Sequence, residues 1–179
     1  VTLVYLLMSL EFPLFDTFYS LFAYDVVGVT GLEWGLISTI GSASLVAVGY
    51  PAGKIVDRIG RKRSMLLAYL FSTPVLVGFM AARGFAQMVV VDILFRVSMS
   101  IFFPAMMALR ADIIPREMRG RVMGLMGTLR SLAMVPAAAV FGYLYEVNRA
   151  YPYMIGVAIE VVTVVIILGL VSEPKTSEE

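Results

Sequence analysis

Cysteine and histidine are both absent from the 179-residue chain. Without cysteine, the chain can form neither a disulfide nor a thiolate metal site, and it has no cysteine nucleophile. Without histidine, it also lacks the commonest metal ligand and the commonest general base. We therefore expect no catalytic residues, no metal site and no cofactor.

Charged residues are scarce as well, at 15% of the chain, and the formal net charge is only +1. A nucleic-acid-binding domain needs a basic surface, so we expect no nucleic-acid partner. Apolar residues, by contrast, make up 60% of the chain, and the mean hydropathy is +0.89. A small domain cannot hide that much apolar surface in its core. This excludes a soluble globular domain and predicts that the lipid bilayer is a partner.

The apolar residues gather into six long runs, separated by short connectors rich in charged and turn residues. Each run is long enough for a transmembrane helix, which needs about 20 mostly apolar residues. The sequence thus predicts an all-α membrane protein, with a six-helix bundle over residues 1–171. The predicted spans are 3–27, 34–52, 64–82, 87–109, 122–145 and 153–171. We expect the polar tail at residues 172–179 to be a frayed terminus.

Lysine and arginine concentrate in two of the connectors, residues 53–63 and 110–121. The other three connectors hold only Arg83 and Arg149. Connectors rich in lysine and arginine stay in the cytoplasm. Six alternating helices place both basic connectors on one side, and both chain ends with them. We expect a multi-pass protein of the cell membrane with both termini in the cytoplasm.

The connector at residues 53–63 has the sequence GKIVDRIGRKR. Its pattern, G-x-x-x-D-R-x-G-R-K-R, resembles the cytoplasmic-loop signature of the major facilitator superfamily, which lies between the second and third helices of a six-helix half. The connector from Arg110 to Gly120 resembles the family's link between helices four and five. The alternative interpretation is a positive-inside loop that happens to contain a glycine and an aspartate.

The resemblance implies that this connector is a gating latch that holds the outward-open state, with Asp112 as the partner of Arg61. The carboxylate of Asp57 is also placed to cap the N-terminus of another helix and interact with its dipole. The simpler alternative is that basic residues such as Lys62 only anchor the topology. The candidate latch residues are Gly53, Asp57, Arg58, Gly60, Arg61, Lys62 and Asp112.

The resemblance further implies a six-helix half built from 3+3 inverted repeats. Such a half works with a second six-helix half of the same chain or with a second copy. Stripes of small residues on the predicted second and fifth helices are typical of a close helix interface; packing within this bundle alone is the alternative. Because the chain begins at Val1 inside a span, we expect a piece of a longer protein. The polar stop after the sixth span favours the C-terminal half.

Several ionisable residues lie inside the predicted spans, where charge is costly and commonly functional. Asp92 and Arg96 are four residues apart, so they share a helix face and can pair. A static ion pair, such as Glu160 with Arg130, is the alternative to a functional role. The resemblance places the first and fourth helices around a central cavity. The candidates for substrate binding or proton coupling are Glu11, Asp16, Asp92, Arg96, Arg130 and Glu160.

These features predict a secondary active transporter that moves a small-molecule substrate by alternating access, coupled to protons or another ion. A carboxyl group in an apolar cavity can serve as the proton carrier. The alternative is a six-helix channel or scaffold without coupled transport, although no connector resembles a selectivity filter. An intramembrane protease of the serine or zinc class is excluded because there is no histidine. The aspartyl class also lacks support, because no Gly-x-Gly-Asp sequence follows Tyr24-Asp25.

Overall fold

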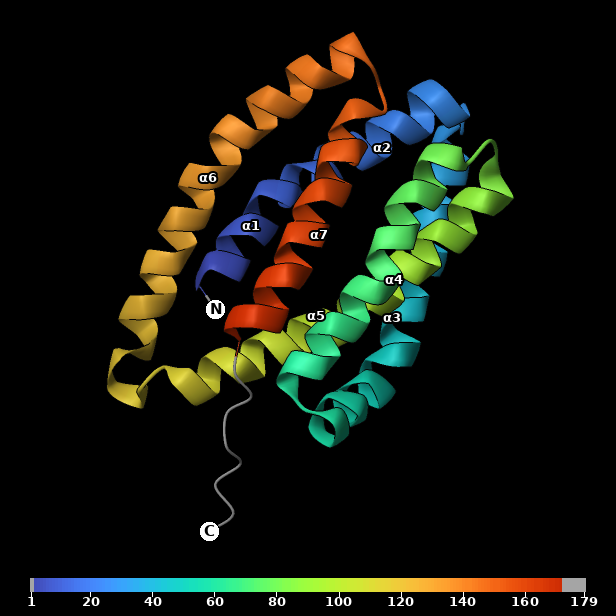
Figure 1. The fold of residues 1–179 in the computed structure, drawn as a ribbon. Coiled ribbons are helices and arrows are strands. Elements are labelled where there is room, and N and C mark those ends of the chain that lie inside the picture. The colour runs from blue at the N-terminus through green and yellow to red at the C-terminus, as the bar shows by residue number, and fades with distance from the viewer. Residues whose placement is uncertain (1, 172–179) are drawn as a thin grey trace.

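The computed structural model describes residues 2–171, which form six helical segments long and apolar enough to cross a membrane (Figure 1). No strand is present within this range. The all-α membrane fold predicted from the apolar runs is therefore confirmed. The tail predicted at residues 172–179 lies outside the described residues.

The first segment, Thr2–Val27, changes its helix type along its length. It consists of α1 (Thr2–Pro13), the π-helical turn η1 (Leu14–Phe18), α2 (Tyr19–Phe22) and a second π-helical turn η2 (Ala23–Val27). Pro13 stands directly before η1 and lacks the N–H that a regular α-helix needs at this point. Gly28 caps the end of the segment, and its φ of 76° is the left-handed conformation that glycine adopts most readily.

The other five segments are single α-helices. They are α3 (Gly31–Ile59), α4 (Arg61–Ala81), α5 (Phe85–Ile113), α6 (Arg119–Val147), which follows the 3₁₀ turn η3 (Arg116–Met118), and α7 (Tyr151–Leu170). A capping box opens α3: Glu33 N donates to Thr30 Oγ1 at 3.3 Å, and Thr30 N donates to Glu33 Oε2 at 2.7 Å. Gly60 alone separates α3 from α4, and its φ of 88° makes the sharp turn possible.

The helices are longer than the sequence predicts at the two basic connectors. The predicted connector 53–63 is helical except at Gly60, and α5 continues through Ile113. The predicted boundaries were placed where charges begin, and this point marks the edge of the apolar layer. A helix can continue beyond that edge, because its backbone hydrogen bonds do not depend on lipid. The two predicted basic connectors are therefore partly helical.

Both basic turns lie at the same end of the bundle (Figure 1). The α3–α4 turn and the η3 turn lie at the lower end of the view, together with the start of α1 and the end of α7. The three other turns lie at the opposite end. This arrangement agrees with the alternation expected from the distribution of lysine and arginine.

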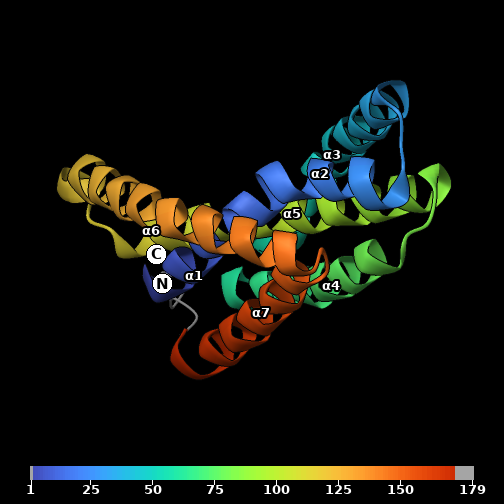
Figure 2. The same cartoon turned by 90° about the horizontal axis from the view of Figure 1, so that it is seen from above.

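The packing of the segments has an internal symmetry (Figure 2). The fourth segment, α5, packs against α3 and α4, which are the second and third segments. The first segment packs in the same way against α6 and α7, which are the fifth and sixth, and α4 packs against α7. Exchanging the first three segments for the last three leaves this set of contacts unchanged. A bundle of 3+3 repeats predicts this pattern.

An aromatic stack fastens the first segment to α4 and α7 at the end opposite the basic turns. The rings of Tyr19 and Phe79 stack with centroids 4.4 Å apart, and Phe22 and Tyr153 meet edge to face at 5.0 Å. The hydroxyl of Tyr153 donates a hydrogen bond of 2.5 Å to the carbonyl oxygen of Phe18 in η1. The upper part of the first segment is thus fixed by packing and by a buried hydrogen bond.

Two helices are barely covered by the rest of the chain. Only 11% of the most apolar stretch of α3 and of α6 is buried, against 44% in the first segment, α4 and α5. Most glycines on these two helices have free space beside them. A Cβ atom added at Gly49, Gly53, Gly120, Gly124 or Gly127 would meet nothing within 4 Å. At these five glycines the small-residue stripes therefore do not pack against the described part of the chain.

Candidate functional site

A cavity of about 260 Å³ lies inside the bundle, and residues of α1, η1, α3, α4, α5 and α7 line it. Its volume is close to the lower limit for small-molecule sites, about 300 Å³. The walls are mostly apolar and include five phenylalanines: Phe12, Phe15, Phe95, Phe102 and Phe103. Four charged residues line it as well: Glu11, Asp16, Arg96 and Glu160. The structure thus brings four of the six predicted intramembrane candidates to one cavity.

Glu160 of α7 is only 2% exposed, and two hydroxyl groups of α4 hold its carboxylate. Ser72 Oγ donates to Oε1 at 2.8 Å, and Thr73 Oγ1 donates to Oε2 at 2.6 Å. The alternative of a static ion pair with Arg130 is wrong: the ion pairs among residues 2–171 are Arg61–Asp112 and Arg96–Asp92. Sequence reasoning missed Ser72 and Thr73, which are ordinary residues within an apolar helix.

Glu11 of α1 is 3% exposed, and its Oε1 atom has no hydrogen-bond partner. A buried polar atom without a partner costs about 1–3 kcal/mol, so such atoms are few in folded proteins. Glu11 and Glu160 line the same cavity, and no cation pairs with either of them within the described range. Asp16, in η1, is exposed by comparison. The cavity therefore holds two buried carboxyl groups that a proton or a cationic group can neutralise.

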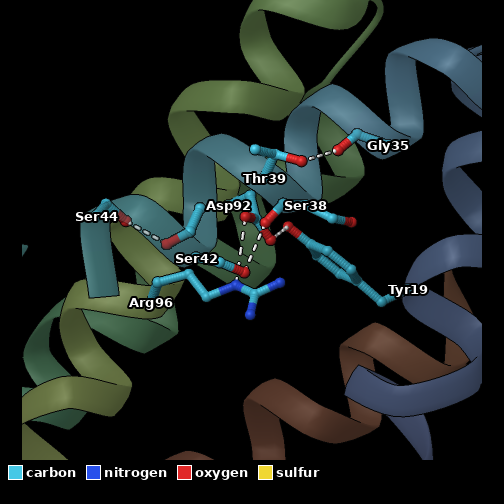
Figure 3. A network of polar contacts seen from close by, with 9 residues as sticks. Tyr19, Gly35, Ser38, Thr39, Ser42, Ser44, Asp92 and Arg96 are labelled. Atoms are coloured by element: carbon cyan, nitrogen blue, oxygen red, sulfur yellow. Dashed lines mark hydrogen bonds and ion pairs between the residues drawn. The ribbon is translucent and has the colours of Figure 1, made fainter. Parts of the chain in front are cut away.

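Asp92 and Arg96 form a network with Tyr19 of the first segment (Figure 3). Arg96 Nε lies 3.4 Å from Asp92 Oδ2, and the Tyr19 hydroxyl donates to Asp92 Oδ1 at 3.1 Å. The ion pair expected from their four-residue spacing is thus present. Asp92 is fully buried and is not part of the cavity wall, whereas Arg96 is. Asp92 positions Arg96 and does not face the cavity itself.

Gly41 makes this network possible, because α3 passes very close to α5 at this residue. A Cβ atom at Gly41 would overlap the carboxylate of Asp92 and would lie 3.2 Å from Arg96 Nε. Ile37 and Gly41 are buried on the face of α3 that packs onto the bundle. The stripe predicted on this helix contains Ser38 and Ser42, which lie beside the network (Figure 3). Sequence reasoning missed Gly41, and its only signal was a glycine inside an apolar run.

The candidate latch residues divide into two groups. Arg61 Nε lies 3.1 Å from Asp112 Oδ2, so the start of α4 is linked to the end of α5. Lys62 Nζ donates to the carbonyl oxygen of Leu168 at 2.9 Å, close to the end of α7. Gly60 supplies the turn between α3 and α4. Asp57, Arg58 and Gly53 contact no charged partner within residues 2–171.

Two arginines lie outside the cavity, in a smaller pocket beside it. Arg130 of α6 has its guanidinium group 4.0 Å from the centroid of the Phe12 ring. Arg110, which the sequence places in a connector, is instead part of α5, only 7% exposed, and its guanidinium group lies 3.8 Å from the Tyr5 ring centroid. Arg110 thus belongs to the last turn of α5, which is longer than the predicted span 87–109.

Six membrane-length segments, five of which line a charge-lined cavity, define the chain as a multi-pass helical membrane protein. The family model of the Major Facilitator Superfamily matches residues 1–179, so the chain belongs to this superfamily. The resemblance inferred from the connector at residues 53–63 is thereby confirmed.

The chain has low sequence identity to curated members of the superfamily. The chain is 20% identical over 151 residues to the quinolone resistance protein NorA of Staphylococcus aureus, an alignment that covers 84% of the chain and 39% of NorA. It is 22% identical over 173 residues to the uncharacterized MFS-type transporter MJ1317 of Methanocaldococcus jannaschii, with 92% of the chain and 44% of that protein covered. The chain spans less than half the length of these relatives.

Proposed function

We propose that the chain is a six-helix unit of a secondary active transporter, which moves a small solute across the cell membrane by alternating access. The observation that carries this proposal is the pair of buried carboxyl groups, Glu11 and Glu160, in one cavity within the bundle. Membership of the superfamily supports it. A channel or scaffold needs no such pair.

Proton coupling follows from the surroundings of these two groups. A negative charge buried without a cation is costly, and a bound proton removes that cost. Water that enters the cavity when it opens stabilises the charged form and lets the proton leave. Arg96, held by Asp92, adds a positive charge to the same wall. Glu11 and Glu160 are the proposed proton carriers, and Arg96 and Asp16 are proposed to contact the solute.

The walls of the cavity indicate the type of solute. Five phenylalanines provide aromatic surface for flat, partly apolar molecules. The relative NorA is a quinolone resistance protein by name. We therefore propose an aromatic solute of quinolone type as the first one to test.

The ends of the bundle have proposed roles as well. The Arg61–Asp112 pair and the Lys62 bond to α7 are proposed to act as a cytoplasmic latch that holds one of the two access states. A second six-helix half, of the same chain or of another copy, is proposed to cover α3 and α6. The low burial of these helices and the free space beside their glycines support this partner. Both chain ends are proposed to lie in the cytoplasm, on the side of the basic turns.

The proposal is tested with the full-length protein in liposomes, by measuring uptake of a quinolone with and without an imposed pH gradient. We expect accumulation that depends on the gradient, and counterflow when the liposomes are preloaded with unlabelled quinolone. The exposed Glu146→Gln variant serves as a control for a lost carboxylate outside the cavity. Passive flux without counterflow would instead show a channel.

A further inference from the structure

The small pocket beside the cavity has a volume of about 140 Å³ and contains two arginines, Arg110 of α5 and Arg130 of α6. None of the described residues that line it is acidic. Neither arginine takes part in an ion pair within residues 2–171. The pocket therefore carries two positive charges, and the described part of the chain supplies no negative charge to balance them.

Arg110 is the more deeply buried of the two, at 7% exposure, and its Nε atom has no hydrogen-bond partner. The guanidinium carbon of Arg110 lies 3.8 Å from the centroid of the Tyr5 ring, so the ring face stabilises part of its positive charge. A ring face attracts a cation but does not replace a charged hydrogen-bond acceptor. A buried cation with an unsatisfied donor is costly, so it indicates a ligand that supplies the missing acceptor.

Arg130 is half-buried and stacks on the ring of Phe12 at 4.0 Å. Tyr5 and Phe12 are seven residues apart, which places them two turns apart on one face of α1. The two rings hold the two guanidinium groups against the same helix face, on the walls of one pocket. This is a prepared arrangement, because the planar guanidinium groups are held by stacking before any ligand binds.

We propose that Arg110 and Arg130 form a binding site for an oxoanion, that is, for a carboxylate or phosphate group. A guanidinium group presents two parallel N–H donors that match two oxygens of such an anion, which favours it over a spherical halide. The site does not depend on the transport proposal. The oxoanion comes either from a free solute or from the head group of an anionic phospholipid, since both present the same oxygens.

The site also adjoins the carboxylate cavity. Met8, Phe12 and Phe103 line both pockets, so the two spaces adjoin at these side chains. The carboxylates Glu11 and Glu160 line the larger cavity and not the small pocket. The larger cavity thus contains both carboxylates and one arginine, Arg96, whereas the small pocket contains two arginines and no described acidic residue, and it is left for an external anion.

Binding is measured on the full-length protein in a neutral detergent, by titration calorimetry and by thermal unfolding. Sodium phosphate and sodium benzoate are the probes, and sodium chloride at equal ionic strength is the reference. We expect saturable binding of at least one probe and a higher unfolding temperature in its presence. The variants Arg110→Met and Arg130→Met should each weaken binding about tenfold or more, because charge-assisted hydrogen bonds are lost.

Matched variants separate a specific site from a general effect of charge. Arg121→Met removes an exposed arginine from α6, the helix that also carries Arg130, and should leave binding unchanged. Arg110→Lys and Arg130→Lys keep the charge but lose the two parallel donors, so binding should be intermediate. In chloride, Arg110→Met should unfold at or above the wild-type temperature, because an unbalanced buried charge is removed. If Arg110→Met unfolds at a lower temperature, its loss of binding can result from its lower stability. The binding measured for Arg130→Met, which replaces a half-buried arginine, then decides the test.

A second pair of measurements identifies the source of the anion. The protein is placed in nanodiscs of phosphatidylcholine alone or with phosphatidylglycerol, and phosphate binding is repeated. If phosphatidylglycerol weakens phosphate binding to the wild type and has no such effect on the Arg130→Met variant, the site binds a lipid head group. If phosphate binds equally well in the two kinds of nanodisc, the site binds a free solute. The proposal is overturned if neither probe nor phosphatidylglycerol binds, or if both methionine variants bind like the wild type.

Discussion

The charges at the basic end of the bundle and the charges in its middle are held in opposite ways. Arg61 and Asp112 pair at 3.1 Å with side chains that are 26% and 34% exposed, so water screens the pair and its strength is modest. Glu11 and Glu160 are 3% and 2% exposed, and neither forms an ion pair within residues 2–171. A pair at the surface can break and re-form at little cost, whereas a buried carboxyl group responds strongly to a proton or a ligand. The first suits a reversible link between helices, and the second suits the capture of a proton or a solute.

The largest effect is expected from the buried carboxyl groups. Glu11→Gln and Glu160→Gln keep the size of the side chain but cannot release a proton. Accumulation of a quinolone driven by a pH gradient should fall to the passive level in each variant, while counterflow without a gradient continues. Uptake into liposomes measures both. Gradient-driven accumulation at the wild-type level in both variants would remove these residues from the coupling mechanism.

The second largest effect is expected from a substitution that disturbs the network around Asp92. Gly41→Ala places a methyl group where the Asp92 carboxylate lies, so the network must shift. Overpacking of this kind costs roughly 1–3 kcal/mol of folding free energy. Thermal unfolding in detergent measures the loss. Gly35→Ala, on the same helix with nothing within 4 Å of the added atom, is the matched control and should unfold at the wild-type temperature. Equal behaviour of the two variants would contradict the close approach of α3 to α5.

Gly60 offers a test at the basic end. Its φ of 88° and ψ of 166° lie in a region that residues with a Cβ atom rarely adopt, so Gly60→Ala should cost about 1–3 kcal/mol. The strain should also move the start of α4, including Arg61. Unfolding temperature and uptake should both fall. A variant with full stability would show that the α3–α4 turn adopts another conformation.

The smallest effect on stability is expected from the latch pair. A double-mutant cycle with Arg61→Ala and Asp112→Ala should give a coupling free energy below about 1 kcal/mol, and high salt should reduce it further. Transport should change more than stability does. The exchange Arg61→Asp with Asp112→Arg should restore the uptake rate that each single change lowers. A coupling free energy well above 1 kcal/mol would contradict a weak pair that is screened by water.

Sequence reasoning could reach the features that depend on neighbouring residues. Apolar runs indicate the six spans, and a four-residue spacing indicates the pairing of Asp92 with Arg96. Arg61 and Asp112 are 51 residues apart, so only the family resemblance connected them. Nothing in the sequence linked Glu160 to Ser72 and Thr73, because contacts between distant helices depend on how the bundle packs. For the same reason, the free space beside Gly49 and the crowding beside Gly41 cannot be told apart from their residue type.

The π-helical turn η1 sets the register between the two parts of the first segment. A π turn contains one residue more than the α-helical turn that it replaces. Its conversion to α-helix would rotate Thr2–Pro13 by about 100° around the helix axis and shift it by about 1.5 Å relative to Tyr19, which the aromatic stack fixes. Such a rotation carries Glu11 to a new direction without unfolding a helix or moving the far end of the bundle. The extra residue in η1 therefore sets the direction in which Glu11 points relative to the fixed ring of Tyr19.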